Sequence, residues 1–309
     1  MISSQQAFDF VRSEFERIFI PDEVLKPLCA RNSGQFLPDG KAAAPIVCDK
    51  IIAALSEKKP LSVVRVGDSE GCAIALTKFA LNAQQVMGFY NSLQKQNGAA
   101  VPLPAAVEFC MELREALTSA DVIGFRAFRN DESIIINGAI ARGELHAALG
   151  ILYAREFLQQ GTERRDWRSA TITSAWIYLN IIPLIVRLAE AANATIVITG
   201  RPELRAEFAR RLGGRLEEFI AVPAQWSAPQ RPELSHFARA FPAVRKRLAC
   251  DLRGKLVLIG AGLFGKIYCH TVKLNGGVGV DLGSAFDILA GLKTRPVHKL
   301  VDMNALRWL

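Results

Sequence analysis

The feature that most constrains the fold of this 309-residue chain is a repeated alternation of short apolar segments with longer helical ones. The apolar segments have strand length and include "LSVVRV" (61–66), "DVIGF" (121–125), "ATIVITG" (194–200), "KLVLIG" (255–260) and "GVGVDLG" (277–283). Because they are apolar without strict alternation, they predict strands that are buried on both faces. We therefore expect an α/β fold: a single Rossmann-like domain whose mostly parallel sheet carries helices on both faces.

The first 58 residues follow a different pattern. Apolar residues at helical spacing predict an amphipathic helix over residues 4–18, and a Gly-, Pro- and Asn-rich loop is expected at "ARNSGQFLPDG" (30–40). A second helix, at 41–58, leads into the first strand. We therefore expect an N-terminal helical extension at residues 1–58 and the Rossmann-like domain at residues 59–309.

The turn after the first predicted strand carries the most specific pattern, "RVGDSE" (65–70). Ligands of parallel sheets bind outside the carboxyl ends of the strands, so this turn is a candidate site. Asp68 and Glu70 are two carboxylates that can hold a divalent cation together with phosphate oxygens, and Gly67 permits close backbone approach. Arg65 ends an apolar strand and needs a charged partner if it is buried. The alternative is that Asp68 only caps the following helix.

A second turn, in "KLVLIGAGLFGK" (255–266), has the G-x-G-x-x-G spacing of dinucleotide-binding turns. Such domains place this turn after their first strand, whereas here only one predicted strand follows it. The letters also resemble a P-loop, but Ile267 replaces the hydroxyl residue that binds Mg²⁺ there. We therefore predict a phosphate-binding turn at Gly260 and Gly262, with Lys266 adding positive charge. The alternative is tight packing of helix on strand, with an exposed lysine.

Three further strand ends carry polar side chains. After the last strand, Asp281, Ser284 and Asp287 are candidates for substrate binding, Asp281 through sugar hydroxyls, and either acid is a candidate general base. Ser174 is a candidate for ribose or acceptor contacts, and Arg201 is a candidate for a diphosphate contact. The alternative for Asp281 and Ser174 is helix capping.

Charge and composition limit the class of protein. The net charge of +8 is spread over many segments, and none of the basic segments interleaves aromatic residues as single-strand nucleic-acid platforms do. No apolar run reaches the roughly 18 residues of a membrane span. The six cysteines lie far apart, without zinc-site spacing. We expect a cytoplasmic protein with reduced cysteines and no nucleic-acid partner.

Two of these segments resemble a known family. "RVGDSEG" (65–71) resembles the R-x-G-D-G-E signature of GT-D-type glycosyltransferases, with Ser69 where glycine is commoner. The segment from 256 to 291 is similar to the strand, glycine turn, helix and D-[IL]-G strand that close that fold. The resemblance spans roughly residues 61–290, and between these segments only the order of strands and helices matches.

The resemblance implies a function and a set of ligands. It implies a hexosyltransferase-like enzyme of polysaccharide biosynthesis that moves a sugar from a nucleotide-diphosphate-sugar donor to a glycan, lipid-linked or protein-linked acceptor. Asp68 and Glu70 would hold Mn²⁺ or Mg²⁺, which neutralises the leaving diphosphate, and no NAD is expected. Catalysis would involve Asp68, Glu70 and Asp281.

Two other functions remain as alternatives. One is an NAD(P)-dependent oxidoreductase that uses the glycine turn and Asp281, and the other is a non-catalytic protein that binds nucleotide sugars. The basic surface and the amphipathic first helix also suggest peripheral contact with the inner face of a membrane. The oligomeric state is not predicted.

Overall fold

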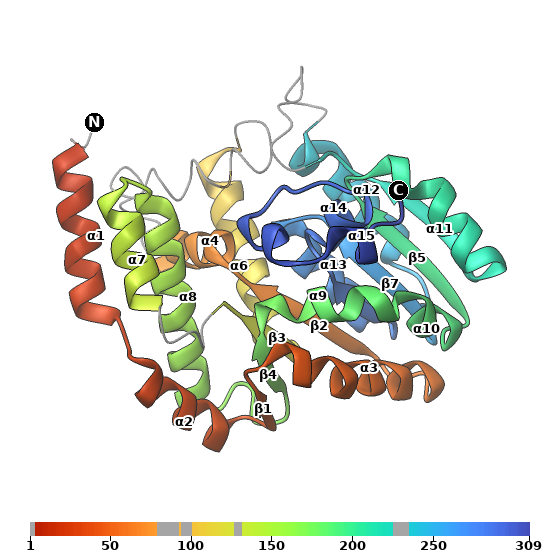
Figure 1. The fold of residues 1–309 in the computed structure, drawn as a ribbon, viewed down its shortest axis with the longest axis horizontal. Coiled ribbons are helices and arrows are strands. Elements are labelled where there is room, and N and C mark those ends of the chain that lie inside the picture. Colours follow the sequence, from red (N-terminus) through yellow and green to blue (C-terminus); the bar gives the residue numbers. More distant parts are fainter. Residues whose placement is uncertain (1–3, 79–92, 94–100, 127–131, 225–234) are drawn as a thin grey trace.

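The computed structural model describes residues 4–78, 93, 101–126, 132–224 and 235–309. These residues contain one sheet of eight parallel strands in the order β1-β4-β3-β2-β8-β7-β5-β6 (Figure 1). The strands are β1 (Gln35–Leu37), β2 (Leu61–Val66), β3 (Val122–Phe125), β4 (Thr171–Ser174), β5 (Ala194–Thr199), β6 (Leu216–Ala221), β7 (Lys255–Gly260) and β8 (Val278–Asp281). The expected Rossmann-like α/β fold is confirmed.

Helices cover both faces of the sheet. One face packs against α4 (Asp68–Lys78), α6 (Leu103–Thr118), α8 (Leu145–Glu163), α12 (Phe241–Leu248) and α13 (Leu263–Leu274). On the outer side of this layer lie α1 (Ser4–Ile18), α2 (Asp22–Asn32) and α7 (Glu132–Ala141). The other face packs against α3 (Gly40–Ser56), α9 (Tyr178–Ile181), α10 (Ile185–Glu190), α11 (Arg205–Leu212), α14 (Ala285–Leu289) and α15 (Met303–Leu306).

The strand β2 shows why the strands are apolar throughout. Val64 and Val66 lie in the core under α4 and α13, whereas Leu61 and Val63 lie in the core under α3. Successive side chains of a strand point to opposite faces, and here each face has its own core. A strand buried on both sides therefore needs apolar residues at nearly every position.

The prediction of a loop at residues 30–40 is wrong in part. Gln35–Leu37 forms the edge strand β1, which pairs in parallel with Thr171–Thr173 of β4. Three residues are too few to show a period in the sequence, and this strand exists because β4 offers an unpaired edge. Residues 1–58 thus contribute a strand to the sheet as well as helices, and the domain boundary after residue 58 stays a prediction. No helix among the described residues is long and apolar enough to cross a bilayer.

Buried polar contacts join the N-terminal helices to α8. Arg155 is 1% exposed and donates to the carboxylate of Asp22 at 2.7 Å and to the carbonyl of Ile20. The Tyr153 hydroxyl donates to Glu14 of α1. In Figure 1, α1 and α7 lie beside α8 at one end of the molecule. The N-terminal helices are therefore packed onto the domain through specific contacts.

Replacing Arg155 with methionine should destabilise the protein by about 3 kcal/mol, because it removes the main counter-charge of the buried Asp22. The measurement is the free energy of unfolding from urea titration. The matched control is Arg187→Met, which breaks an ion pair with Asp49 in which both side chains are more than half exposed. This control should change stability by less than about 0.5 kcal/mol. Equal losses in the two variants would contradict the prediction.

Candidate functional site

The strand order places the first and last strand ends of the domain next to each other. From β2 the chain runs outward to β3 and β4, then crosses to β5 and β6, and finally fills the centre with β7 and β8. Such a reversal of direction is a topological switch point, where parallel sheets bind ligands at their carboxyl ends. Because β8 pairs with both β2 and β7, the residues that follow these three strands meet at one edge.

The turn after β2 leaves the Asp68 carboxylate without a partner among the described residues and engages Glu70. The Gly67 N–H donates to Glu70 Oε2 at 2.7 Å, which is the return contact of a capping box. Glu70 is buried, whereas Asp68 is half-buried. Among the described residues, no hydrogen bond or ion pair involves the Asp68 carboxylate. The predicted alternative, capping of the helix by the Asp68 side chain, is not found among the described contacts; Glu70 makes the return contact instead, and the Asp68 oxygens are open to a ligand.

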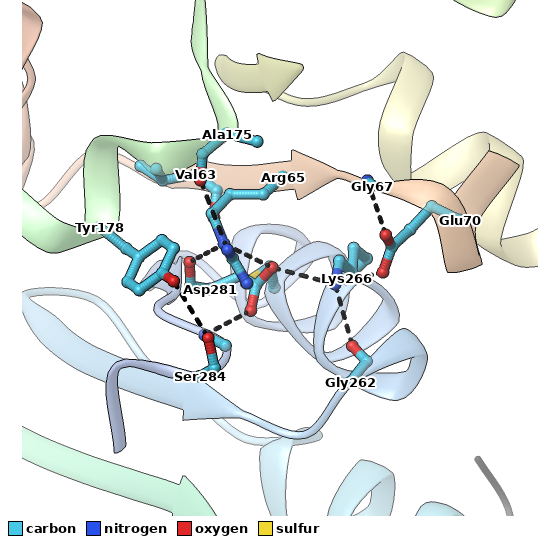
Figure 2. Close-up of polar contacts among 12 residues, drawn as sticks. Val63, Arg65, Gly67, Glu70, Ala175, Tyr178, Gly262, Lys266, Asp281 and Ser284 are labelled. Carbon is cyan, nitrogen blue, oxygen red and sulfur yellow. Dashed lines mark hydrogen bonds and ion pairs between the residues drawn. The ribbon is translucent and has the colours of Figure 1, made fainter. Parts of the chain in front are cut away.

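Lys266 lies between two carboxylates (Figure 2). Its ammonium is 2.5 Å from Glu70 Oε1 and 3.1 Å from Asp281 Oδ2, and it donates to the Gly262 carbonyl at 3.1 Å. The side chain is only 3% exposed. Burial acts to lower the pKa of Lys266, but the attraction of Asp281 and Glu70 outweighs it, so the pKa lies above its usual value. Lys266 is therefore a buried ammonium at neutral pH, and the exposed lysine considered in the sequence analysis is not found.

Arg65 has the buried charged partner that its position demanded. Its Nε donates to the Asp281 carbonyl at 3.2 Å and lies 3.5 Å from Asp281 Oδ2. Its Nη1 donates to the Ala175 carbonyl at 3.4 Å, and the guanidinium lies 4.5 Å from the ring centroid of Tyr178. As Figure 2 shows, Arg65 links the ends of β2 and β8 to the segment after β4. Arg65 therefore holds these three segments in place beneath the site.

Asp281 is enclosed by these contacts. Its side chain has no exposed surface, and Oδ1 accepts a hydrogen bond from the Gly283 N–H at 3.0 Å. It contacts both Arg65 and Lys266. Asp281 thus has a structural role beneath the site, where it pairs with Arg65 and Lys266. Its catalytic role stays a prediction.

The charges of this strand-end cluster do not cancel. We use that name for Arg65, Asp68, Glu70, Lys266 and Asp281. The negative charges of Glu70 and Asp281 balance the positive charges of Arg65 and Lys266. The negative charge of Asp68 is not balanced within the cluster. A half-buried carboxylate without a counter-ion favours a cation nearby.

The cluster can bind a metal ion only if Glu70 changes its contacts. Within the ranges that the structure describes, no three His, Cys, Asp or Glu side chains are grouped so as to hold a metal. Asp68 offers a free carboxylate, but Oε1 of Glu70 lies against Lys266. Two carboxylates and the oxygens of a diphosphate suit Mg²⁺ or Mn²⁺. The residues therefore fit such an ion if Glu70 turns away from Lys266.

The glycine turn after β7 is explained partly by packing. A Cβ on Gly260 would lie 2.3 Å from Phe286 Cδ2, and a Cβ on Gly265 would lie 3.1 Å from Ile259 Cγ2. Gly262 has φ = 56°, in the region that favours glycine, and is the N-cap of α13. The packing alternative thus accounts for Gly260, whereas the phosphate-binding role of the Gly262 turn stays a prediction.

Ser284, Arg201, Asp287 and Ser174 lie outside the cluster, and Ser284 contacts residues that the sequence patterns did not single out. Ser284 bonds to Tyr178 Oη and to His298 Nε2, each at 3.1 Å. No sequence spacing relates these three residues, since they come from different elements.

Arg201 and Asp287 form a separate pair, and Ser174 is a cap. Arg201 Nε donates to Asp287 Oδ1 at 2.6 Å, and Thr294 also donates to Asp287. Ser174 accepts from the Trp176 N–H at 3.2 Å, at the start of the short 3₁₀ helix Ala175–Ile177. The capping alternative for Ser174 is confirmed.

Comparison with known protein families gives one match. The model of the GT-D fold-like domain, from the GT-D-like family, matches residues 43–289, which is 247 of the 309 residues. The matched region begins inside α3, ends with α14 and contains strands β2 to β8. Neither a curated protein nor a solved structure matches the chain significantly.

Proposed function

Because the chain belongs to the GT-D-like family, whose fold is glycosyltransferase-like, we propose that it is a glycosyltransferase that uses a nucleotide-diphosphate-sugar donor. The observation that carries the proposal is the strand-end cluster at the switch point of the sheet. There Asp68, which has no partner in the part of the chain that the structure describes, lies two residues before Glu70, and Glu70 contacts the buried ammonium of Lys266. The carboxylates at this edge of the sheet would attract the cation, and its ammonium group would attract the diphosphate.

The chemistry that the cluster must support is departure of a nucleoside diphosphate. A divalent cation bound by Asp68 and Glu70 would neutralise the negative charge that develops on the leaving group. The first N–H groups of α13, together with the Gly262 turn, would bind phosphate oxygens, as the N-terminus of a helix commonly does. Arg65 and Asp281 hold the ends of β2 and β8 in place, so that Lys266 stays positioned while Glu70 turns toward the cation.

Arg201 and Asp287, which lie outside the strand-end cluster, also have roles in this proposal. Arg201 is a quarter exposed and would reach a diphosphate by exchanging its contact with Asp287. Asp287 is then the more accessible of the two acids considered as general base, since Asp281 has no exposed side-chain surface. We propose a glycan, lipid-linked or protein-linked acceptor in polysaccharide biosynthesis, with the basic surface contacting the inner face of the membrane where a lipid-linked acceptor lies.

A thermal-shift panel tests the donor class. We expect one UDP- or GDP-sugar with Mn²⁺ or Mg²⁺ to raise the melting temperature, since a ligand at a hundred times its Kd adds about 2.7 kcal/mol of stability. NAD(H) should cause no shift. Stabilisation by NAD(H), with no effect of any nucleotide sugar, would favour the oxidoreductase. A donor that binds but is neither hydrolysed nor transferred would favour the non-catalytic alternative.

A further inference from the structure

Within the strand-end cluster, Glu70 is the residue that would bind both the Lys266 ammonium and the divalent cation. In the structure its Oε1 forms an ion pair with Lys266 at 2.5 Å, and its Oε2 accepts from Gly67. In the proposed function it is also a ligand of a divalent cation. An ammonium in contact with a carboxylate oxygen repels a dication on the same carboxylate, and water screens this repulsion weakly at a buried site.

We propose that Lys266 competes with the divalent cation for Glu70, and that this competition sets the cation affinity of the site. The inference rests on the proposed function in one respect, namely that Asp68 and Glu70 form the cation site. In the absence of nucleotide, Lys266 holds Glu70 and the affinity for Mn²⁺ is low.

The exchange of Glu70 between the two cations leaves no buried charge unpaired. When Glu70 leaves Lys266, the ammonium keeps Asp281 Oδ2 and the Gly262 carbonyl, each at 3.1 Å. Glu70 itself keeps the Gly67 N–H through its other oxygen. Lys266 then has one of its three donors available for an anionic group such as a phosphate.

Asp281 cannot take part in the same exchange. It is fully buried, its Oδ1 accepts from the Gly283 N–H, and its Oδ2 is contacted by Arg65 as well as by Lys266. Of the two carboxylates that neutralise Lys266, only Glu70 lies on the turn that also carries the unpaired Asp68. The competition is therefore confined to Glu70.

The test is Mn²⁺ binding to the full chain without nucleotide, measured by electron paramagnetic resonance of the free ion and by calorimetry. Lys266→Met removes the competing charge and should bind Mn²⁺ at least about tenfold more tightly than wild type. Lys266→Gln, which keeps an N–H donor, should give the same gain and decides the question if the methionine variant does not fold. The matched control is Lys255→Met. Lys255 begins β7, at the end of that strand away from the site, and the substitution breaks its ion pair with Glu217 of β6, so Mn²⁺ affinity should stay unchanged.

Competition for Glu70 is separated from a general change in charge by E70Q alone, which removes one negative charge, and not by the double variant E70Q/K266M, which keeps the wild-type net charge. The Mn²⁺ affinity of the double variant should return to the wild-type level, whereas E70Q alone should change the affinity less than twofold, because Lys266 already occupies Glu70. A K266M or K266Q variant that folds and binds Mn²⁺ like wild type would overturn the inference, as would a gain that persists in E70Q/K266M. Because no donor is present, these results are independent of the ligand panel. A failed panel with the predicted Mn²⁺ gains would refute the transferase but not the competition.

Discussion

Replacing Asp68 with asparagine should lower the rate of donor hydrolysis or transfer at least about a hundredfold, which is the typical effect of removing one group that stabilises transition-state charge. Stability should stay within about 0.5 kcal/mol of wild type. The reason is that the Asp68 carboxylate is half-buried and makes no hydrogen bond or ion pair with the described residues, so the fold loses no contact. Steady-state kinetics with the donor found by the panel and urea unfolding measure the two effects.

Glu70→Gln should differ from Asp68→Asn in a specific way. It should reduce turnover as strongly, but it should also destabilise the protein, because it removes a buried charge that contacts Lys266 at 2.5 Å. Lys266 keeps Asp281, so we expect a loss of about 1–3 kcal/mol rather than unfolding. If Asp68→Asn turned over donor at the wild-type rate, the cation site would not include Asp68.

Replacing Gly150 with alanine should destabilise the protein by about 3 kcal/mol, at the upper end of the range for overpacking, and should also impair the site. Helices α4 and α8 touch backbone to backbone at Gly71 and Gly150. A Cβ on Gly150 would lie 2.0 Å from the carbonyl oxygen of Asp68, and a Cβ on Gly71 would lie 1.7 Å from the carbonyl oxygen of Gly150. Neither obstacle is a flexible side chain, so the helices must separate.

The effect on the site follows from which atom is displaced. The clash involves the backbone of Asp68, at the first position of α4, so relief of the clash moves the turn that carries both carboxylates. We therefore expect the Gly150 variant to lose Mn²⁺-dependent stabilisation as well as stability. Gly214→Ala is the control, because a Cβ there meets nothing within 4 Å and the backbone is not left-handed. Stability of Gly150→Ala equal to that of this control would show that the close crossing of the two helices is not required.

Much of the fold could be predicted because each buried strand shows its environment in its own residues. The predicted segment at 61–66 has the bounds of β2, and the predicted helix at 4–18 has those of α1. The edge strand β1 was missed because its three residues owe their conformation to β4. The helical segment after β4, at residues 175–190, is broken into short pieces around Pro183, which cannot donate a helical hydrogen bond.

For the candidate site, the sequence identified residue types but not their partners. It located the turn with Asp68 and Glu70 and the turn with Lys266, and it required a charged partner for Arg65. It could not show that Lys266 contacts Glu70, 196 positions away, or that Arg65 contacts Asp281, 216 positions away. It also gave Gly260 a phosphate-binding role where Phe286 already accounts for the absence of a side chain.

The sequence by itself determined the class of fold and the strand ends that carry polar groups, because burial on both faces and the need for turn residues are local properties of the chain. The tertiary structure decided which carboxylate is free and which is paired. That outcome depends on the insertion of β8 between β2 and β7, which brings the last α/β unit against the first. The sequence alone does not distinguish the roles of Asp68 and Glu70. In the structure the buried ammonium of Lys266, 196 positions from Glu70, neutralises Glu70, whereas the Asp68 carboxylate has no partner among the described residues and is open to a ligand.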